Sequence, residues 1–338
     1  MKFKTSAYIL GLIGLALVTL LIAYRGFEPV YNCLIVAGWN VLWVSFFHLV
    51  PMFFDSLSWY VLVDHENRPS MLIMIWMRWI REGIDSLLPV AQIGGELIGA
   101  RLLTFKQVSG SAAGASIIVD TTLSVITQIV FTLTGFILMI LIKQDNSMIM
   151  SALAGIFIGI FCITGFIIAQ LRGMFGVLVT WLSKISGENL VEMAGGAANL
   201  DGAIRNLYTK TSRLILASFW QLIAWIVGAG EVWLALYILG HPVSFFKALF
   251  LESLGMAVRN AAFAVPGSLG FQEGGYMVLV TVLGLNPEVG LALSLVKRVR
   301  ELIFGIPALV HWQMVEGKKI WSLKKKPNPQ KTKTGDDV

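Results

Sequence analysis

Long apolar runs dominate the chain and predict an all-helical protein that crosses a membrane several times. A transmembrane helix needs about 20 mostly apolar residues. Runs of this kind cover roughly residues 7–23, 34–63, 112–142, 149–170, 214–239 and 289–315. We therefore expect an all-α polytopic membrane fold with about six full spans.

Two further hydrophobic blocks, 71–105 and 245–284, contain helix-breaking residues near their centres. Proline removes a backbone N–H and clashes with the preceding turn, and glycine weakens a helix interior. Each half of a block is short for a span, so we predict that each block forms two half-helices in a re-entrant hairpin. The expected helix breaks are Pro89, Gly94, Gly95, Pro266, Gly267 and Gly270.

The order of these elements predicts an inverted repeat. A span, a hairpin and a span follow one another in residues 34–142 and again in 214–315. The segment 143–213 contains one span and a cytoplasmic loop, so the second unit starts from the opposite side of the membrane. Residues 1–33 are expected to form an N-terminal span with an outer loop, and 316–338 a basic tail. Inverted repeats whose broken helices meet near the membrane centre are typical of transporters.

A shift of 177 residues also aligns individual positions of the two units. It superimposes Pro89 on Pro266, Glu96 on Glu273, and Asp120 on Lys297. These coincidences are few, so the shared order of elements is the stronger support for a repeat.

The composition agrees with a membrane protein. Hydrophobic residues make up 56% of the chain and charged residues 14%, with a mean hydropathy of +0.75, whereas soluble domains contain about 25% charged residues. The two cysteines and four histidines are scattered and show no metal-binding spacing. The segment GSLGFQEGG lacks a preceding strand and a following GK[ST], so it is no nucleotide loop. We expect neither a metal nor a cofactor.

Basic residues predict the orientation of the chain. Lysine and arginine concentrate in 171–213 and 316–338, so the positive-inside rule places both termini in the cytoplasm. This result is the same whether the interrupted blocks re-enter or cross twice. The tail is expected to lie against anionic lipid rather than to bind nucleic acid, since no stacking aromatic residues repeat there. The spacing from Glu188 to Tyr208 predicts an amphipathic surface helix, either a connector or a regulatory element.

Charged residues also occur inside the apolar blocks, where they are costly and usually face a protein interior or a wet cavity. Local neutralisation is one interpretation, because three oppositely charged pairs are four residues apart and share a helix face. These pairs are Arg78–Glu82, Arg81–Asp85 and Lys297–Glu301. Asp55 and Glu231 have no such local partner.

The charges beside the two breaks form matched sets. Glu96 and Glu273 each follow a proline by seven residues, and Arg81 and Arg259 precede the same prolines. Half-helix N-termini expose free N–H groups and a partial positive charge that favour an anion. Each glutamate is expected to cap such an end, to contact a cationic ligand group or to exchange a proton. Together these groups suit an amphiphile with a charged or hydroxylated headgroup; a purely structural role is the alternative.

Four segments carry a family resemblance: LLPVAQIGGELIGARLL, SIIVDTTLSVITQIVFTLTG, AVRNAAFAVPGSLGFQEGGYMVL and LALSLVKRVRELIFG. Over about residues 5–315, the chain resembles the flippase-like membrane domain of lysylphosphatidylglycerol synthases. Within that family, it most resembles the stand-alone branch associated with hopanoid biosynthesis.

The resemblance implies a bacterial inner-membrane protein that moves lipids between leaflets. The break motifs of the family fall on Arg81, Pro89, Glu96, Arg259, Pro266 and Glu273, while Asp120, Arg298 and Glu301 lie in its other matched stretches. Full-length synthases carry a soluble aminoacyl-transferase domain after the membrane part. Here a lysine-rich tail follows residue 315, so we do not expect that synthetic activity.

The leading hypothesis is a lipid flippase with a headgroup cavity between two inverted hairpins. Arg81 and Arg259 would hold phosphate or hydroxyl groups, while Glu96 and Glu273 would bind a cationic group or carry protons. We expect a gating or coupling role for Asp120, Lys297, Arg298 and Glu301. The chain has no ATP-binding motif, so we expect coupling to a gradient or downhill movement.

Two other classes of function stay open. A membrane enzyme acting on a lipid headgroup ranks lower, because the sequence shows no clustered histidines and no aspartate-rich metal motif. A scaffold for envelope-lipid enzymes is the other. The lipid itself is equally open among hopanoids, aminoacyl phospholipids, ordinary phospholipids and polyprenyl-linked sugars, and so is homo-oligomerisation.

Overall fold

The computed structural model describes residues 38–64, 68–88, 94–143, 197–262, 268 and 270–324, apart from a few side chains at the ends of these ranges. The predicted spans 7–23 and 149–170 and most of the basic tail lie outside the described residues. Within them, every regular element is a helix.

The described helices follow one another with short connections. They are η1 (Gly38–Asn40), α3 (Val41–Phe47), α4 (Leu49–Leu62), α5 (Met71–Leu87), α6 (Gly94–Thr104), α7 (Gly110–Lys143), α11 (Ala197–Thr209), α12 (Thr211–Ile238), α13 (Phe245–Ala261), α14 (Phe271–Val282) and α15 (Pro287–Lys324). Helix α11 coincides with the end of the predicted amphipathic segment; the start of that segment lies outside the described residues.

Three helical stretches are long and apolar enough to cross a membrane: Gly38–Leu62, Gly110–Ile142 and Thr211–Ile238. They coincide with the predicted spans 34–63, 112–142 and 214–239. The predicted span 289–315 lies within α15, which is longer than expected and carries a cluster of charges between Lys297 and Glu301. The all-helical membrane class is therefore supported, while the number of spans stays a prediction.

Both interrupted blocks are divided into two helices. Helix α5 ends at Leu87, and Leu88 is extended (φ −94°, ψ 144°) because proline at the next position disfavours the helical conformation. Helix α14 begins after Gly270, whose φ of +82° is a left-handed conformation that glycine adopts without steric cost. Pro89, Pro266 and Gly267 lie outside the described residues. Whether the helix pairs re-enter the membrane stays a prediction.

A proline in the first turn of α4 explains the short break between α3 and α4. Pro51 lacks a backbone N–H, and its ring clashes with the carbonyl of the residue four positions earlier, Phe47. Helix α3 ends at Phe47, and α4 begins at Leu49. His48 therefore lies at the junction of the two helices.

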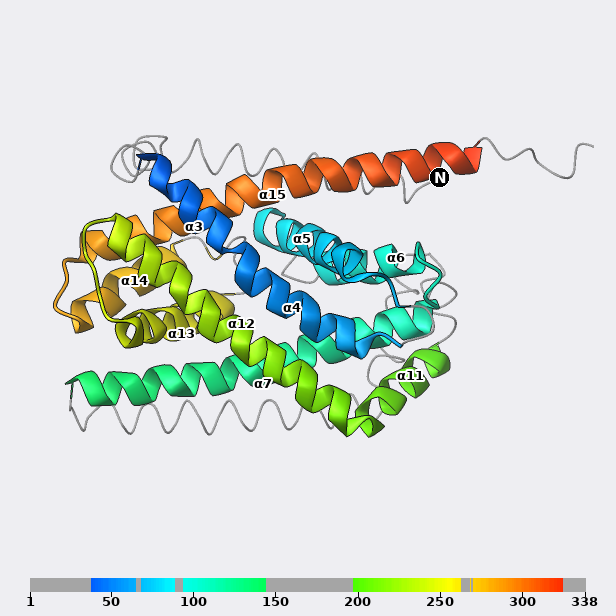
Figure 1. Ribbon diagram of the computed structural model, residues 1–338, viewed down its shortest axis with the longest axis horizontal. Coiled ribbons are helices and arrows are strands. Elements are labelled where there is room, and N and C mark those ends of the chain that lie inside the picture. The colour runs from blue at the N-terminus through cyan, green and yellow to red at the C-terminus, as the bar shows by residue number, and fades with distance from the viewer. Residues whose placement is uncertain are drawn as a thin grey trace, which may run out of the picture.

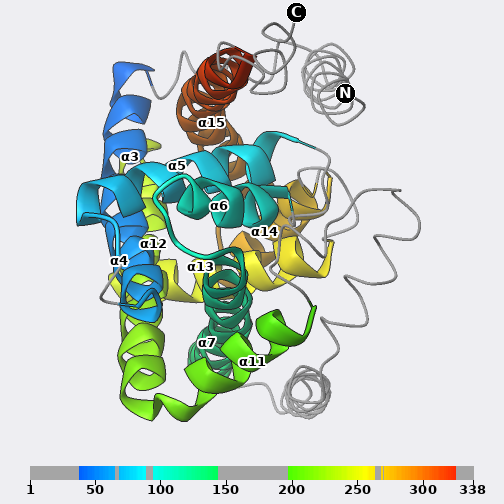
Figure 2. The same ribbon diagram turned by 90° about the vertical axis from the view of Figure 1, so that its right-hand side faces the viewer.

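Two pairs of helices pack between two long helices, α7 and α15. Figure 1 shows α15 along one edge and α7 along the other, with the pairs α5–α6 and α13–α14 between them. The view in Figure 2, turned by 90°, shows α7 and α15 nearly end-on at opposite ends of the molecule. Helix α7 packs against α6 and α13, whereas α15 packs against α5 and α14.

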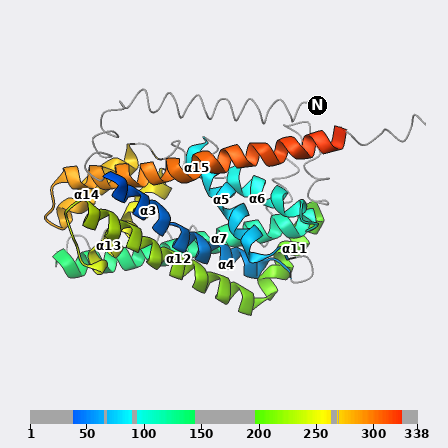
Figure 3. The same cartoon turned by 45° about the horizontal axis from the view of Figure 1, so that its top comes forward.

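Helices α4 and α12 cross one side of this arrangement and pack extensively on each other (Figure 3). The apolar core is divided accordingly. One cluster joins α12, α13, α14 and α15 around Phe250 and Tyr276, and another joins α4, α5, α6 and α7 around Trp59 and Ile80. The charged residues described next lie between these apolar clusters.

Candidate functional site

A network of charged side chains runs through the interior of the helix assembly. Its carboxyl groups outnumber its cationic groups. The carboxyl groups are Asp55, Glu82, Asp85, Glu96, Asp120, Glu231, Glu252, Glu273 and Glu301; the cations are Arg78, Arg81, Arg259, Lys297, Arg298 and Arg300. We call this set, together with His48, the buried ion-pair network.

Arg81 is the centre of the first cluster and is only 2% exposed. Its guanidinium forms ion pairs with Glu96 of α6 and with Asp120 of α7, the latter at 3.2 Å. It also lies over the ring of Trp59, 4.4 Å from the centroid, as in a cation–π interaction. Arg81 therefore joins three helices to its own.

The carboxylate of Asp120 is the shared acceptor for donors from several side chains. Arg78 approaches its carboxylate at 3.4 Å and Gln221 of α12 at 3.2 Å, in addition to Arg81. Arg78 also pairs with Asp55 of α4 at 3.3 Å. A buried carboxylate is tolerated when its lone pairs are satisfied in this way.

The N-terminus of α6 is capped from the preceding helix. The carboxylate of Asp85 accepts a hydrogen bond from the backbone N–H of Gly95 at 2.8 Å. Glu96 is thus not the cap and is available to Arg81. Gly99 makes this approach feasible, because a Cβ there would lie 2.6 Å from Arg81 Cδ.

The second break is arranged differently. Glu273 itself accepts a hydrogen bond from the backbone N–H of Gly270 at 2.6 Å, next to the start of α14. The same carboxylate lies 3.3 Å from Arg298 of α15. Arg259 pairs instead with Glu301 of α15, which also binds Arg298 at 2.9 Å.

Lys297 pairs with a carboxylate that the sequence hypothesis did not assign to the site. Its Nζ lies 2.5 Å from Glu252 of α13, and the hydroxyl of Tyr276 donates to the same carboxylate at 3.0 Å. Both charged side chains are almost fully buried. The pair fixes α13 against α15.

His48 lies between carboxylates of two helices and is the main member of the network that the sequence analysis did not single out. Its Nε2 lies 2.6 Å from Glu82 of α5, and its Nδ1 lies 3.0 Å from Glu231 of α12. Arg300 of α15 contacts Glu231 at 3.1 Å and His48 Nδ1 at 2.7 Å. The available signal was the position of His48 inside the predicted span 34–63, where a titratable group is costly.

The structure corrects the local-pairing interpretation. None of the three i,i+4 pairs, Arg78–Glu82, Arg81–Asp85 and Lys297–Glu301, is among the ion pairs of the described residues; their members bind mainly across helices. Helix packing brings partners on neighbouring helices into the interior, whereas a pair along one helix face would leave the facing carboxylates unneutralised.

Of the predicted binding set, Arg81 and Glu96 are brought together, while Arg259 and Glu273 each bind a different residue of α15. Of the residues with an expected gating or coupling role, Asp120 lies in the first cluster, apart from Lys297 and its partner Glu252. Sequence equivalence therefore did not predict the partners of these residues.

Several buried donors remain without a hydrogen-bond partner among the described residues. They include Arg81 Nε at the first break, and Gln272 Nε2 and Arg298 Nη2 at the second. A buried unpaired donor costs about 1–3 kcal/mol. These positions are therefore favourable for acceptor atoms such as headgroup oxygens.

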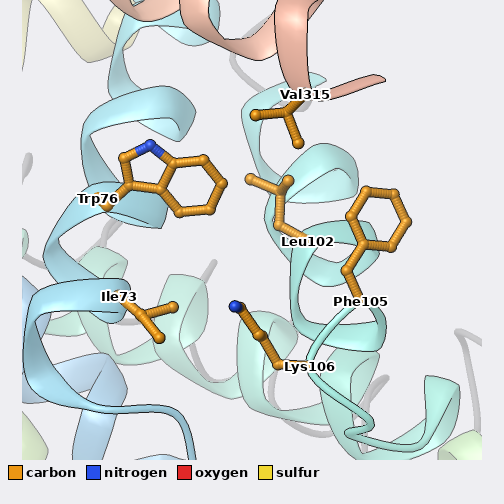
Figure 4. Close-up of a pocket in the computed structure, with 6 residues that line it drawn as sticks. All are labelled: Ile73, Trp76, Leu102, Phe105, Lys106 and Val315. Carbon is orange, nitrogen blue, oxygen red and sulfur yellow. The ribbon is translucent and has the colours of Figure 1, made fainter. Parts of the chain in front are cut away.

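Two hollows flank α5. The smaller, of about 350 Å³, is lined by Ile73, Trp76, Leu102, Phe105, Lys106 and Val315. Figure 4 shows the Lys106 side chain directed toward Ile73 across this hollow, with Trp76 and Phe105 on its sides. The larger, of about 430 Å³, lies between α3–α4, α5 and α15 and shares Trp76 with the smaller.

The helical fold, the three long apolar helices and the charges buried between them define a polytopic helical membrane protein. The family model of the lysylphosphatidylglycerol synthase TM region matches residues 9–308, and the chain belongs to this family. A UPF0104 membrane protein of Pyrococcus horikoshii is 22% identical over 321 residues, 90% of this chain and 94% of that protein. No solved structure matches the chain. Family membership indicates a function connected with membrane lipids.

Proposed function

We propose that this protein moves an amphipathic lipid between the leaflets of the bacterial cytoplasmic membrane. One observation carries the proposal: charged residues at both helix interruptions form a buried network that still contains unpaired donors. In a membrane, such charges usually mark a substrate or ion pathway. The headgroup enters this network laterally while its tails stay in the bilayer.

Headgroup oxygens would accept hydrogen bonds from the unpaired donors at the two breaks. Arg81 Nε would donate to the headgroup at the first break, and Gln272 Nε2 and Arg298 Nη2 would donate at the second. Glu96 and Glu273 bind a cationic group or carry protons. Asp120, Lys297, Arg298 and Glu301 act as gates or coupling groups, because exchange of their ion pairs loosens α7 or α15 from the helix pairs.

The contacts between helices support a repeat of two units that function alternately. If α4, α5, α6 and α7 correspond to α12, α13, α14 and α15, the contact of α5 with α15 matches that of α13 with α7. The contact of α6 with α7 likewise matches that of α14 with α15. A rocking movement of one unit against the other would expose the headgroup site to each leaflet in turn.

The cytoplasmic placement of both termini and the contact of the basic tail with anionic lipid belong to the same proposal. Both rest on the positive-inside distribution of lysine and arginine. A cysteine-accessibility assay at position 334 in inside-out and right-side-out vesicles tests this orientation.

The central test is transbilayer movement of a fluorescent phospholipid in proteoliposomes, measured by dithionite quenching of the outer leaflet. We expect the purified protein to accelerate movement, and Glu96→Gln and Glu273→Gln to slow it severalfold. Glu288→Gln is the matched control, because Glu288 is exposed at the start of α15. Unchanged rates in both network variants would overturn the site assignment.

The same vesicles separate transport from the other two classes of function. Mass spectrometry of the lipids after incubation would reveal a modified headgroup if the protein were an enzyme. Full rescue of a deletion strain by the Glu96→Gln, Glu273→Gln double variant would favour a scaffold. We expect unmodified lipid and no rescue.

A further inference from the structure

The larger hollow is an apolar groove between α3–α4, α5 and α15. Its volume of about 430 Å³ is within the usual range of about 300–1,000 Å³ for ligand pockets. Leu42, Ser45, Phe46, Leu49, Met52, Leu72, Ile75, Trp76, Trp79, Ile303 and Phe304 line it. Leu72 is 79% exposed and Phe46 59%, so the groove opens toward surface that a membrane protein presents to lipid.

One wall of the groove adjoins the connection between the two clusters. Phe304 lines the groove and contacts the ring of His48 edge-on, with centroids 5.6 Å apart. Trp79 lies nearly one helical turn before Glu82 and donates its indole N–H to the carbonyl of Phe304 at 3.0 Å. The apolar groove therefore ends beside polar groups that join α4, α5, α12 and α15.

Glu82 is the accessible member of these polar groups. Its Oε1 atom contacts His48 Nε2 at 2.6 Å and Arg300 Nη1 at 3.4 Å. Its Oε2 atom has no hydrogen-bond or ion-pair partner in the described part of the chain, and 36% of the side chain is exposed, more than in Glu96 or Asp55. An accessible carboxylate oxygen without a partner is a favourable acceptor for a donor from another molecule.

We propose that the groove holds a hydrocarbon chain of one membrane lipid and that Glu82 Oε2 accepts a hydrogen bond from the headgroup of that lipid. The inference rests on the proposed lipid transport and deepens it by naming an entry site. The excess of carboxyl groups over cations in the network supports a donor headgroup at this position. The lipid would then meet the protein where α5 of the first unit packs on α15 of the second.

The proposal predicts different binding affinities for two common phospholipids. Phosphatidylethanolamine carries N–H donors on its headgroup, whereas phosphatidylcholine has the same charge but no such donor. If a hydrogen bond to Glu82 selects the lipid, the first binds more tightly by about tenfold, the effect of one hydrogen bond to a charged group. If only charge or an apolar surface matters, the two bind alike.

Photocrosslinking in vesicles tests the location. Each phospholipid carries a diazirine in one acyl chain, and labelled peptides of the full-length protein are identified by mass spectrometry. We expect phosphatidylethanolamine to label the groove residues of α3–α4, α5 and α15 about tenfold more than phosphatidylcholine. Glu82→Gln should reduce this preference, and the comparison of lipids on the unaltered protein does not depend on how that variant folds.

A blocking substitution tests the function of the groove. Leu49→Trp fills the groove and should lower both groove labelling and transport severalfold. Leu141→Trp is the matched control, because Leu141 is 68% exposed on α7 and does not line the groove. The control variant should transport and label as the unaltered protein does.

The outcomes separate this inference from the proposed function. Transport with labelling elsewhere, or transport unaffected by Leu49→Trp, overturns the groove as entry site and leaves lipid transport standing. Groove labelling without any transport supports the lipid site and overturns the proposed function. Equal labelling by the two phospholipids overturns the role of Glu82, and crosslinking of the groove to a second copy of the chain overturns lipid as its occupant.

Discussion

The two helix interruptions have similar sequences but different chemistry. At the first, Asp85 of the preceding helix accepts the Gly95 N–H, which leaves Glu96 to pair with Arg81. At the second, Glu273 accepts the Gly270 N–H and must also bind Arg298. Where Asp85 caps the helix, the glutamate binds only its arginine; where no other residue does so, the glutamate both caps the helix and binds an arginine.

The two long helices α7 and α15 differ as well. Helix α7 contributes Asp120 to the network, whereas α15 contributes a dense group from Lys297 to Glu301. Arg78 and Arg81 of α5 share Asp120 in the first cluster, whereas α15 supplies several charged partners to the second. This asymmetry predicts that the helices around Arg81 are held more rigidly than those around the charged group of α15.

The largest expected effect is at Arg81. Arg81→Met leaves Glu96 without its cation and weakens the neutralisation of Asp120, so we expect a loss of about 3–5 kcal/mol in unfolding free energy. Arg259→Met should cost clearly less, because Glu301 retains Arg298 at 2.9 Å and Arg300 at 3.7 Å. Denaturant titration in detergent micelles measures both. Equal losses would contradict the proposed asymmetry.

A double-mutant cycle sharpens the same comparison. Arg81 and Glu96 are in direct contact, so their coupling energy should lie within about 0.5–3 kcal/mol. Arg259 and Glu273 are linked only through Glu301 and Arg298, so their coupling should be weaker than that of Arg81 and Glu96. The variants Arg81→Met, Glu96→Gln, Arg259→Met and Glu273→Gln supply both cycles. Strong coupling in the second pair would mean that the two breaks are equivalent after all.

Glycine substitutions give a smaller effect of opposite sign in the two units. A Cβ at Gly99 would lie 2.6 Å from Arg81 Cδ, so Gly99→Ala should destabilise by about 1–3 kcal/mol through overpacking. Gly274 of α14 has nothing within 4 Å of the added Cβ. Gly274→Ala should stabilise by about 0.4–1 kcal/mol, because alanine restricts the unfolded chain. Thermal unfolding in one detergent compares the two.

The smallest effect is expected at an exposed ion-pair group outside the candidate spans. Hydrogen bonds from Lys210 at 2.9 Å and Arg213 at 2.6 Å lower the pKa of Asp64. Because the pKa is lowered, these contacts stabilise the fold at pH values above the ordinary pKa of the carboxyl, near 3.8. This stabilisation is lost as the pH falls through the lowered pKa. Asp64→Asn should cost no more than about 1 kcal/mol at neutral pH, since the carboxylate is half exposed.

The pH dependence of unfolding supplies the check on Asp64. The difference between Asp64→Asn and the unaltered protein should disappear as the pH falls through the lowered pKa of Asp64, and it should shrink at high salt. A difference that persists under both conditions would show that Asp64 acts by packing rather than by charge. The exposed cluster thus serves as a reference for the buried network.

Much of the fold follows from local pattern. Apolar runs of sufficient length predicted the helices at 34–63, 112–142 and 214–239, and both interrupted blocks divide into two helices as expected, although Gly94 and Gly95 begin α6 rather than interrupt it. Proline and glycine act through local backbone geometry, so their effect can be read without tertiary contacts. The family, too, was recognisable from the segments around the breaks and in the closing helices.

The pairing of the charges was not predictable in the same way. Sequence spacing suggested Arg78–Glu82 and Arg81–Asp85, but Arg78 binds Asp55 and Asp120, while Asp85 caps α6. His48 had no visible partner in the sequence at all. Partners separated by tens or hundreds of residues come together through packing, which local spacing does not encode.

The sequence by itself determined that this chain is a helical membrane protein with charged residues at interrupted helices, because hydrophobicity and backbone restrictions act locally. Only the tertiary structure decided which carboxylate neutralises which cation, that Glu82 Oε2 has no partner among the described residues, and that His48 contacts carboxylates of both α5 and α12. Those properties depend on distances between helices, and a buried charge selects its partner by position in space rather than by position in the chain.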